Sequence, residues 1–255
     1  MTFFGIESPE EQKEVYDHLL AIREIYDKRG YSSFSADNLL ALWRIIAFAR
    51  DDAFMTAFRE YAEDSSDEAK LWKVHTYCWA CQSASAIDGD FVECGVFRGL
   101  YSATMARYLE FSRSDRSLYL YDTFEGIPEA GSTEIERRFN IVYDEEKDLY
   151  ARVIERFAEF ANVEVVKGVV PEVLDDIAPD HIAFLHVDLN ASAAETAALD
   201  KLFDRVTDGG IVLLDDYGRG EQISVFKAHS EWFGDRNYPI LELPTGQGLI
   251  IKRGI

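Results

Sequence analysis

The chain has 255 residues, of which 47% are hydrophobic and 29% charged, so it can bury one sizeable core and is too varied for a disordered or fibrous protein. Its 47 acidic residues outnumber its 26 basic residues and give a net charge of −21, which excludes nucleic acid and anionic membranes as expected partners, because both are bound mainly through Lys and Arg. The chain has no apolar run of about 18 residues for a membrane span and no basic and apolar leader for secretion, so we expect a cytoplasmic protein.

The first part of the chain is predicted to be helical. Ser8, Pro9 and Glu11 form a capping box with proline at the first helical position, and the helix that they begin should end at Gly30. Further helical patterns, without strand alternation between them, run through residues 38–50, 52–62 and 68–84. We therefore expect an all-helical N-terminal extension over residues 1–87.

From the turn at residues 88–90, short apolar runs alternate with segments of helical length. The runs are residues 91–95, 117–122, 163–168, 182–188, 210–216, 238–243 and 248–252. Such alternation predicts crossover units and a mostly parallel sheet. Only residues 244–247 separate the last two runs, which predicts a hairpin and one antiparallel strand. We expect an α/β domain over residues 88–255 with a doubly wound, Rossmann-like sheet of seven strands.

The three cysteines are too few for a disulfide framework. Cys78 and Cys81 form a C-x-x-C motif that could serve redox or metal chemistry. The motif lies in an apolar helical stretch before the first predicted strand, where positions i and i+3 share a helix face. We interpret the pair as buried helix residues and Cys94 as a buried strand residue.

In doubly wound sheets, ligands bind beyond the carboxyl ends of the strands. After the first strand, Gly95 and Gly99 would let the backbone approach a ligand at a helix N-terminus. Their G-x-x-x-G spacing differs from the dinucleotide G-x-G-x-x-G, and a plain strand-to-helix turn is the alternative. Asp122, at the end of the second strand, is placed to accept hydrogen bonds from a ribose, although it could instead cap the following loop.

Three aspartates follow the fourth and fifth predicted parallel strands. Asp188, Asp215 and Asp216 would repel one another at adjacent strand ends unless a cation lies between them. Oxygen-only ligation indicates Mg²⁺ or another divalent cation, and ordinary helix capping is the alternative. Strand alternation turns His186 away from its neighbours, so we expect it to be structural, and we expect His229 to lie on a surface or half-buried helix face.

Five sequence blocks together resemble the macrocin O-methyltransferase family over about residues 67–252. The blocks are FVECGVFRG (91–99), YDTFEGIPE (121–129), KGVVPEVL (167–174), HVDL (186–189) and GGIVLLDDYG (209–218). The resemblance implies a class I methyltransferase fold that uses S-adenosylmethionine and Mg²⁺. It also implies methylation of sugar hydroxyls on macrolide and aminocoumarin antibiotics and related glycans.

The resemblance also assigns roles to residues. It implies that the N-terminal helices form a mobile lid that also builds a dimer. It places the amino-acid end of the cofactor at Glu93, Gly95 and Gly99, its ribose at Asp122, its adenine at Gly168 and Val169, further cofactor contacts at Ser102, Thr123 and Asp188, and the metal at Asp188, Asp215 and Asp216.

One position departs from the family pattern. The family has Asp-x-Asp after the fourth strand, and its second Asp takes the proton from the substrate hydroxyl. Here Asn190 occupies that position beside Asp188, and an amide cannot accept a proton at neutral pH. Water or Asp216 could take the proton instead. The alternatives are a different acceptor, a non-catalytic cofactor-binding protein, or a nucleotide-dependent oxidoreductase, which the missing G-x-G-x-x-G argues against.

Overall fold

The computed structural model describes residues 2–254, and the chain divides into two compact units after Thr76. In the first unit, helix α1 (Pro9–Asp27) begins as predicted, with the backbone amide of Glu11 donating to Ser8 Oγ at 3.3 Å. The other helices of this part are α2 (Asp52–Tyr61), α3 (Ser65–Ala69) and α4 (Leu71–Ala84), which continues into the second unit. The helices predicted within residues 52–62 and 68–84 are confirmed.

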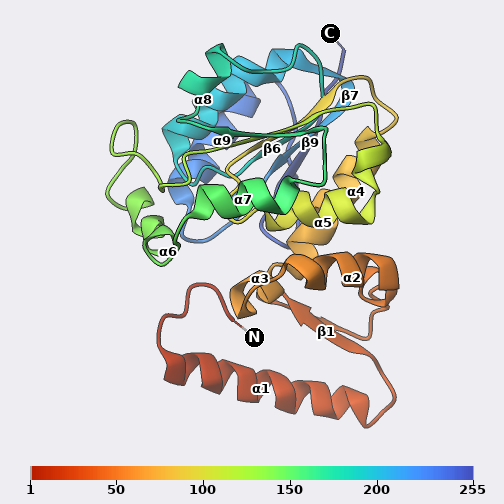
Figure 1. Ribbon diagram of the computed structural model, residues 1–255. Helices are drawn as coiled ribbons and strands as arrows, with labels where there is room; N and C mark the ends of the chain where they lie inside the picture. Colours follow the sequence, from red (N-terminus) through yellow and green to blue (C-terminus); the bar gives the residue numbers. More distant parts are fainter. Residues whose placement is uncertain (1, 255) are drawn as a thin grey trace. The chain divides into compact units, whose positions relative to one another are not determined.

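The predicted helix over residues 38–50 is wrong. Strands β1 (Ser33–Ala36) and β2 (Leu39–Leu42) form an antiparallel hairpin there (Figure 1), and only a 3₁₀ turn, Phe48–Arg50, is helical. The hairpin turn is Asp37-Asn38, whose φ angles of 52° and 57° lie in the left-handed region that Asp and Asn tolerate. This two-residue turn brings Ala36 opposite Leu39, and the chain pairs with itself instead of coiling.

The second unit contains the predicted seven-stranded sheet. Its strands are β3 (Asp90–Cys94), β4 (Leu118–Asp122), β5 (Val163–Lys167), β6 (Ile182–Val187), β7 (Val206–Leu214), β8 (Leu241–Glu242) and β9 (Gly248–Ile251). Their spatial order is β5-β4-β3-β6-β7-β9-β8. β3 to β7 pair in parallel, and β9 runs antiparallel to both β7 and β8. The fold prediction, with one antiparallel strand from the terminal hairpin, is confirmed.

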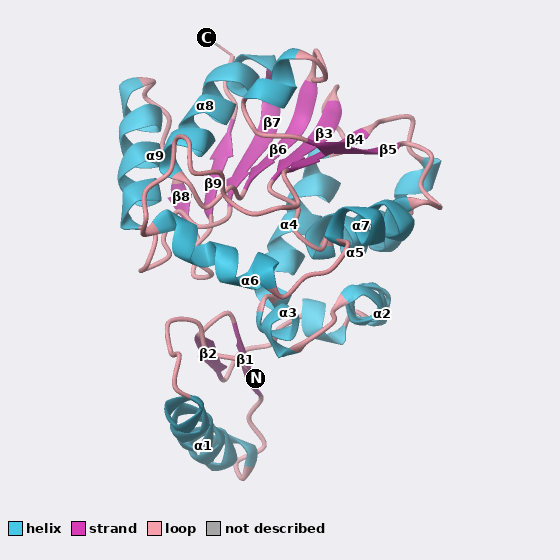
Figure 2. Cartoon of the chain, turned by 60° about the vertical axis from the view of Figure 1, so that its left-hand side comes forward, coloured by secondary structure: helices cyan, strands magenta, loops and turns pink. Residues whose placement is uncertain are grey.

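Helices cover both faces of this sheet (Figure 2). On one face lie α5 (Leu100–Tyr108), α7 (Leu149–Phe157) and the part of α4 that belongs to this unit. On the other face lie α8 (Ser192–Leu202) and α9 (Ile223–Asp235). The short helix α6 (Ile141–Asp144) lies in the connection between β4 and α7. Because the two crossover directions diverge from β3 and β6, the switch point of the sheet lies between these strands.

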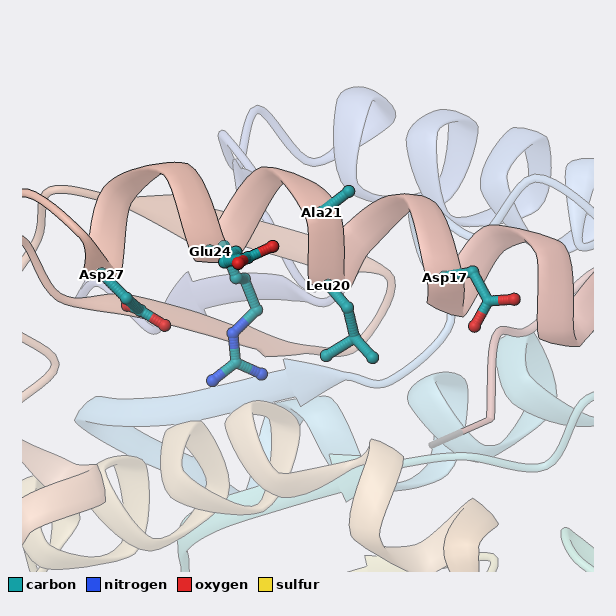
Figure 3. Close-up of a pocket in the computed structure, with 6 residues that line it drawn as sticks. Asp17, Leu20, Ala21, Glu24 and Asp27 are labelled. Atoms are coloured by element: carbon teal, nitrogen blue, oxygen red, sulfur yellow. The ribbon is translucent and has the colours of Figure 1, made fainter.

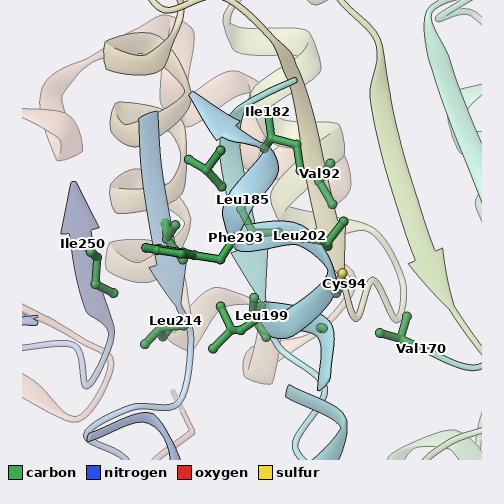
Figure 4. Packing of buried hydrophobic residues seen from close by; sticks show 14 of the residues in the cluster. Val92, Cys94, Val170, Ile182, Leu185, Leu199, Leu202, Phe203, Leu214 and Ile250 are labelled. Carbon is green, nitrogen blue, oxygen red and sulfur yellow. The ribbon is translucent and has the colours of Figure 1, made fainter. Parts of the chain in front are cut away.

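A continuous apolar core holds the central strands in place (Figure 4). All six residues of β6 are buried, and Leu185 packs with Leu199, Leu202 and Phe203 between the sheet and α8. Each fully buried side chain of this size contributes about 1.5–3 kcal/mol. The ends of β3, β6 and β7 are therefore rigidly positioned. No helix in residues 2–254 is long and apolar enough to cross a membrane.

Candidate active site

The turn after β3 is shaped around Gly95. Its backbone amide donates to Tyr121 O at 2.8 Å, and its φ of +92° lies in the region that glycine favours. A Cβ at this position would lie 1.8 Å from the carbonyl oxygen of Asp188. Only glycine therefore lets the end of β3 pack against the end of β6. Gly99, with φ +77°, precedes the first residue of α5.

Asp122 organises the same turn from the end of β4. Its Oδ2 accepts hydrogen bonds from the backbone amides of Val96 at 2.7 Å and Phe97 at 2.8 Å, and its Oδ1 accepts one from Phe124 N at 2.6 Å. Tyr143 of α6 also donates its hydroxyl to Oδ2 at 3.4 Å. The carboxylate is thus committed to shaping two loops, including the loop-capping contact weighed from the sequence. Its role toward a ribose stays a prediction.

Glu93 and Ser102 lie in a buried polar group on the α4 side of the sheet. Tyr77 of α4 donates its hydroxyl to Glu93 Oε2 at 3.3 Å and lies the same distance from Ser102 Oγ. Both residues are at most 1% exposed. The side chains of Glu93 and Ser102 therefore lie buried against Tyr77 on the α4 side of the sheet. Their contact with a cofactor stays a prediction.

The remaining cofactor candidates line the ends of β4 and β5. Thr123 Oγ1 donates to Gly126 O at 2.7 Å, which fixes the turn after Asp122. Gly168 N donates to Asp122 O at 2.9 Å, and the neighbouring Val169 is 40% exposed. Thr123 and Gly168 thus lie at the Asp122 loop; the adenine contact of Gly168 and Val169, and the cofactor contact of Thr123, stay predictions.

The three aspartates after β6 and β7 converge. Asp188, Asp215 and Asp216 each offer a carboxylate oxygen, and these oxygens all lie within 4.8 Å of one another. Asp215 and Asp216 are buried and Asp188 is half-buried. Three carboxylates in this space fit a divalent cation that prefers oxygen ligands, since such an ion offsets their mutual repulsion. The predicted cluster is therefore assembled by the fold.

His186 lies behind this cluster, on the face of β6 opposite Leu185 and Val187, as strand alternation predicted. Its Nδ1 is 3.2 Å from Glu93 Oε1 and its Nε2 is 3.5 Å from Asp215 Oδ1. Burial lowers the pKa of His186, but the hydrogen bonds to Asp215 and Glu93 outweigh this effect and raise its pKa to about 10. Burial raises the pKa of Glu93, and His186 opposes that rise. The imidazole therefore lies between the Glu93 and Asp215 carboxylates, and both favour its protonated form.

Four residues that the sequence did not single out complete the surroundings of the cluster. Gln247 Nε2 donates to Asp215 Oδ1 at 2.9 Å, and Tyr101 donates its hydroxyl to Asp215 Oδ2 at 3.4 Å. Arg219 Nη1 lies 3.6 Å from Asp216 Oδ1, and Gln222 Nε2 donates to Asn190 Oδ1 at 2.8 Å. None of these four residues lies in a sequence motif that would predict its contact with the aspartates or with Asn190. Only the proximity of Arg219 and Gln222 to the aspartate pair in sequence could have indicated them.

The segment 130–150, which connects β4 to α7, is held beside the N-terminus of α8 by Glu136. Glu136 Oε1 accepts hydrogen bonds from the Ser192 amide at 2.9 Å and the Ser192 hydroxyl at 2.8 Å. Burial raises the pKa of Glu136, but these bonds and those from Thr133 lower it overall. The Arg219 guanidinium lies over the Phe139 ring, 5.2 Å from its centroid. This segment therefore forms a wall next to Asp216.

Another pocket lies along α1 in the first unit (Figure 3). Its lining residues come from α1 alone and include none of the predicted site residues: Asp17, Leu20, Ala21, Arg23, Glu24 and Asp27.

Cys78 and Cys81 are fully buried free thiols, and burial raises the pKa of both well above the ordinary range. Burial therefore disfavours the thiolate form that redox and metal chemistry require.

Comparison with known proteins decides the family. The model of the macrocin-O-methyltransferase (TylF) family matches residues 68–235, which include the Gly95 turn and all three aspartates. The chain belongs to this family. The membership confirms the resemblance seen in the sequence and the prediction of a methyltransferase.

Two curated relatives of this TylF-family chain are O-methyltransferases by name, and the name of the first includes a rhamnosyl group. The 8-demethyl-8-(2,3-dimethoxy-alpha-L-rhamnosyl)-tetracenomycin-C 4'-O-methyltransferase of Streptomyces olivaceus is 30% identical over 55% of this chain and 58% of its own length. The mycinamicin III 3''-O-methyltransferase of Micromonospora griseorubida is 25% identical over 82% of this chain and 85% of its own. The first match thus spans less than two thirds of that relative.

A solved structure confirms the fold. The O-methyltransferase NovP superposes with a TM-score of 0.62 at 16% identity, and the superposition covers 93% of this chain and 98% of NovP. The doubly wound sheet with its antiparallel strand is therefore the methyltransferase type that the sequence predicted.

Proposed function

We propose that this chain transfers a methyl group from S-adenosylmethionine to a hydroxyl of a sugar or glycoside, with Mg²⁺ held by Asp188, Asp215 and Asp216. The convergence of these carboxylates beside the Gly95 turn, at the switch point of the sheet, carries the proposal. Membership of the TylF family supports methyl transfer, and the rhamnosyl group in the name of the tetracenomycin relative supports a sugar hydroxyl as the acceptor.

The methyl donor fits the chemistry of the turn. The Gly95 and Gly99 loop leads into the N-terminus of α5, and Asp122 fixes the loop through two backbone amides. The backbone carbonyl oxygen of Asp188 lies against Gly95, and its partial negative charge beside the turn favours a sulfonium cation. We assign Glu93, Gly95, Gly99, Ser102, Asp122, Thr123, Gly168, Val169 and Asp188 to this donor.

The acceptor hydroxyl loses a proton during transfer, and Asn190 cannot take it. When bound, Mg²⁺ would orient the acceptor oxygen and lower its pKa. We assign the proton to Asp216 or to solvent. The Asn190 amide instead donates a hydrogen bond to Asp188 and accepts one from Gln222. A well-placed base contributes about 10² to 10⁴ in rate, so the native protein should be a slow enzyme that gains from a base at this position.

We further propose that the protein acts in the cytoplasm as a homodimer or higher oligomer, with residues 1–87 as lid and dimerisation element. The first unit exposes large apolar side chains that a second copy would cover: Leu20 at 40%, Ile25 at 53%, Trp43 at 67% and Ile45 at 76%. The three cysteines of the protein, all in the second unit, are free thiols, which suits a reducing compartment.

The test is a methylation assay with labelled S-adenosylmethionine, with Mg²⁺ or with EDTA, against deoxysugar nucleotides and glycosides. The proposal expects a labelled product that requires Mg²⁺, and calorimetric binding of S-adenosylmethionine by the same sample. Failure to bind the donor would overturn it.

The second candidate, a non-catalytic cofactor-binding protein, is favoured by Asn190. The Asn190→Asp variant discriminates between the two: methylation by this variant supports the enzyme, whereas donor binding without methylation by either protein supports the binding module.

A further inference from the structure

A buried chain of hydrogen bonds links the start of α9 to the aspartate cluster. Gln222, the residue before α9, is 1% exposed, and its Nε2 donates to Asn190 Oδ1 at 2.8 Å. Asn190 Nδ2 in turn donates to Asp188 Oδ1 at 3.0 Å. Two amides therefore connect a helix to one carboxylate oxygen of Asp188.

The direction of this chain is fixed by chemistry. An ionised carboxylate only accepts hydrogen bonds, so Asn190 must turn its NH₂ group toward Asp188. Its carbonyl oxygen then faces Gln222, which must supply an NH₂ group in turn. Gln222 thus orients Asn190, and Asn190 orients Asp188. An aspartate at position 190 would lose the hydrogen bond to Asp188 while gaining a proton acceptor, so the Asn190→Asp variant should bind the cation more weakly and its methylation is assayed at saturating Mg²⁺.

Glu195 of α8, with His229 of α9 beside it, fixes the backbone at residues 189 and 190. Glu195 of α8 accepts hydrogen bonds on Oε1 from the amides of Leu189 at 3.1 Å and Asn190 at 2.9 Å. These bonds hold Asn190 at a φ of 56°, in the left-handed region. Glu195 Oε2 lies 2.9 Å from His229 Nε2, and both side chains are at most 1% exposed. The expectation that His229 lies on a surface or half-buried face is wrong.

We propose that Gln222 and Glu195 are positioning residues that hold the Asp188 carboxylate in place for the divalent cation. Where the family has a proton-accepting Asp, this protein has Asn190, which donates a hydrogen bond to the proposed metal ligand Asp188. The inference rests on the proposed function, since it requires a cation at Asp188. Partners that orient metal ligands contribute about 10- to 100-fold to metal affinity in other sites.

The test measures Mn²⁺ binding to the full-length chain by electron paramagnetic resonance, without substrate. Gln222→Met keeps the size of the side chain and removes the donor, so Mn²⁺ affinity should fall about 10-fold while S-adenosylmethionine affinity stays within about twofold of native. The matched control is Ser224→Ala, two residues further along, which removes a hydrogen bond to Glu136 outside this chain of contacts.

A second pair of variants tests the backbone contact. Glu195→Met should also weaken Mn²⁺ binding, and Glu195→Gln should restore most of it, because a glutamine oxygen can accept the same two amide bonds. A native protein that binds Mn²⁺, with Gln222→Met and Glu195→Met binding it as tightly, overturns this inference and leaves the proposed function standing. A native protein that binds no Mn²⁺ overturns the metal site and this inference together.

Discussion

Replacing Asp188 by asparagine should stabilise the metal-free protein and remove its response to Mg²⁺. In the metal-free state Asp188 faces Asp215 and Asp216, with ligand oxygens at most 4.8 Å apart. At that distance and an effective dielectric constant of about 20, each pair repels by about 3.5 kcal/mol. The attraction of Arg219, which acts on all three carboxylates, and the neighbouring His186 offset part of this repulsion.

The half-buried position of Asp188 allows solvent to reduce the remaining repulsion, so we expect Asp188→Asn to raise the unfolding free energy in EDTA by about 1 kcal/mol. Mg²⁺ at 100 times its dissociation constant should add about 2.7 kcal/mol to the native protein and almost nothing to the variant. Urea unfolding with EDTA or with Mg²⁺ measures both effects. A variant that is less stable than native in EDTA, or that gains equally from Mg²⁺, would refute the electrostatic reasoning.

Three further predictions follow from other parts of the structure. Gly95→Ala should lower the unfolding free energy by at least about 2 kcal/mol and weaken S-adenosylmethionine binding, because the alanine Cβ would overlap the Asp188 carbonyl. Thermal unfolding and calorimetry measure the two effects, and a variant with native stability and affinity would contradict the prediction. Cys78 and Cys81 should react with Ellman's reagent only after unfolding, and rapid reaction of the folded protein would show that they are accessible. Burial lowers the pKa of His75 below its ordinary 6.5, and Asp51 opposes this shift. Below about pH 6.5 the unfolded chain therefore binds a proton more readily than the folded chain, so the unfolding free energy falls as the pH drops. His75→Phe should reduce this acid-side loss in urea titrations at pH 5 to 7, and an unchanged slope would count against it.

The sheet could be predicted from sequence because its strands are short, apolar and separated by helices. β6 is buried along its whole length, and its apolar run ends directly at Asp188. Parallel topology then places the carboxyl ends of β6 and β7 side by side, which is why Asp188, Asp215 and Asp216 could be grouped before any coordinates.

The hairpin of the first unit could not be predicted from hydrophobic periodicity. Leu39–Leu42 is half-buried throughout and shows no alternation, so its apolar run is equally compatible with a helix. The Asp37-Asn38 turn was the available indication, because both residues tolerate positive φ.

The polar network behind the aspartates depends on contacts between separate elements. His229 and Glu195 lie on different helices, and His186 reaches Glu93 on β3 and Asp215 after β7. Sequence patterns indicate which residues share a face of one element, but they do not indicate which polar groups on different elements meet. The replacement at Asn190 was visible in the sequence, whereas its partner Gln222 became visible only in the fold.

The most direct measurement of the central claim is an anomalous difference map from crystals grown with MnCl₂ and S-adenosylhomocysteine. The account predicts one Mn²⁺ peak coordinated by oxygens of Asp188, Asp215 and Asp216, with the nucleoside beside the Gly95 turn. A map in which the Arg219 guanidinium fills the space between the three carboxylates, with no peak there, would contradict it.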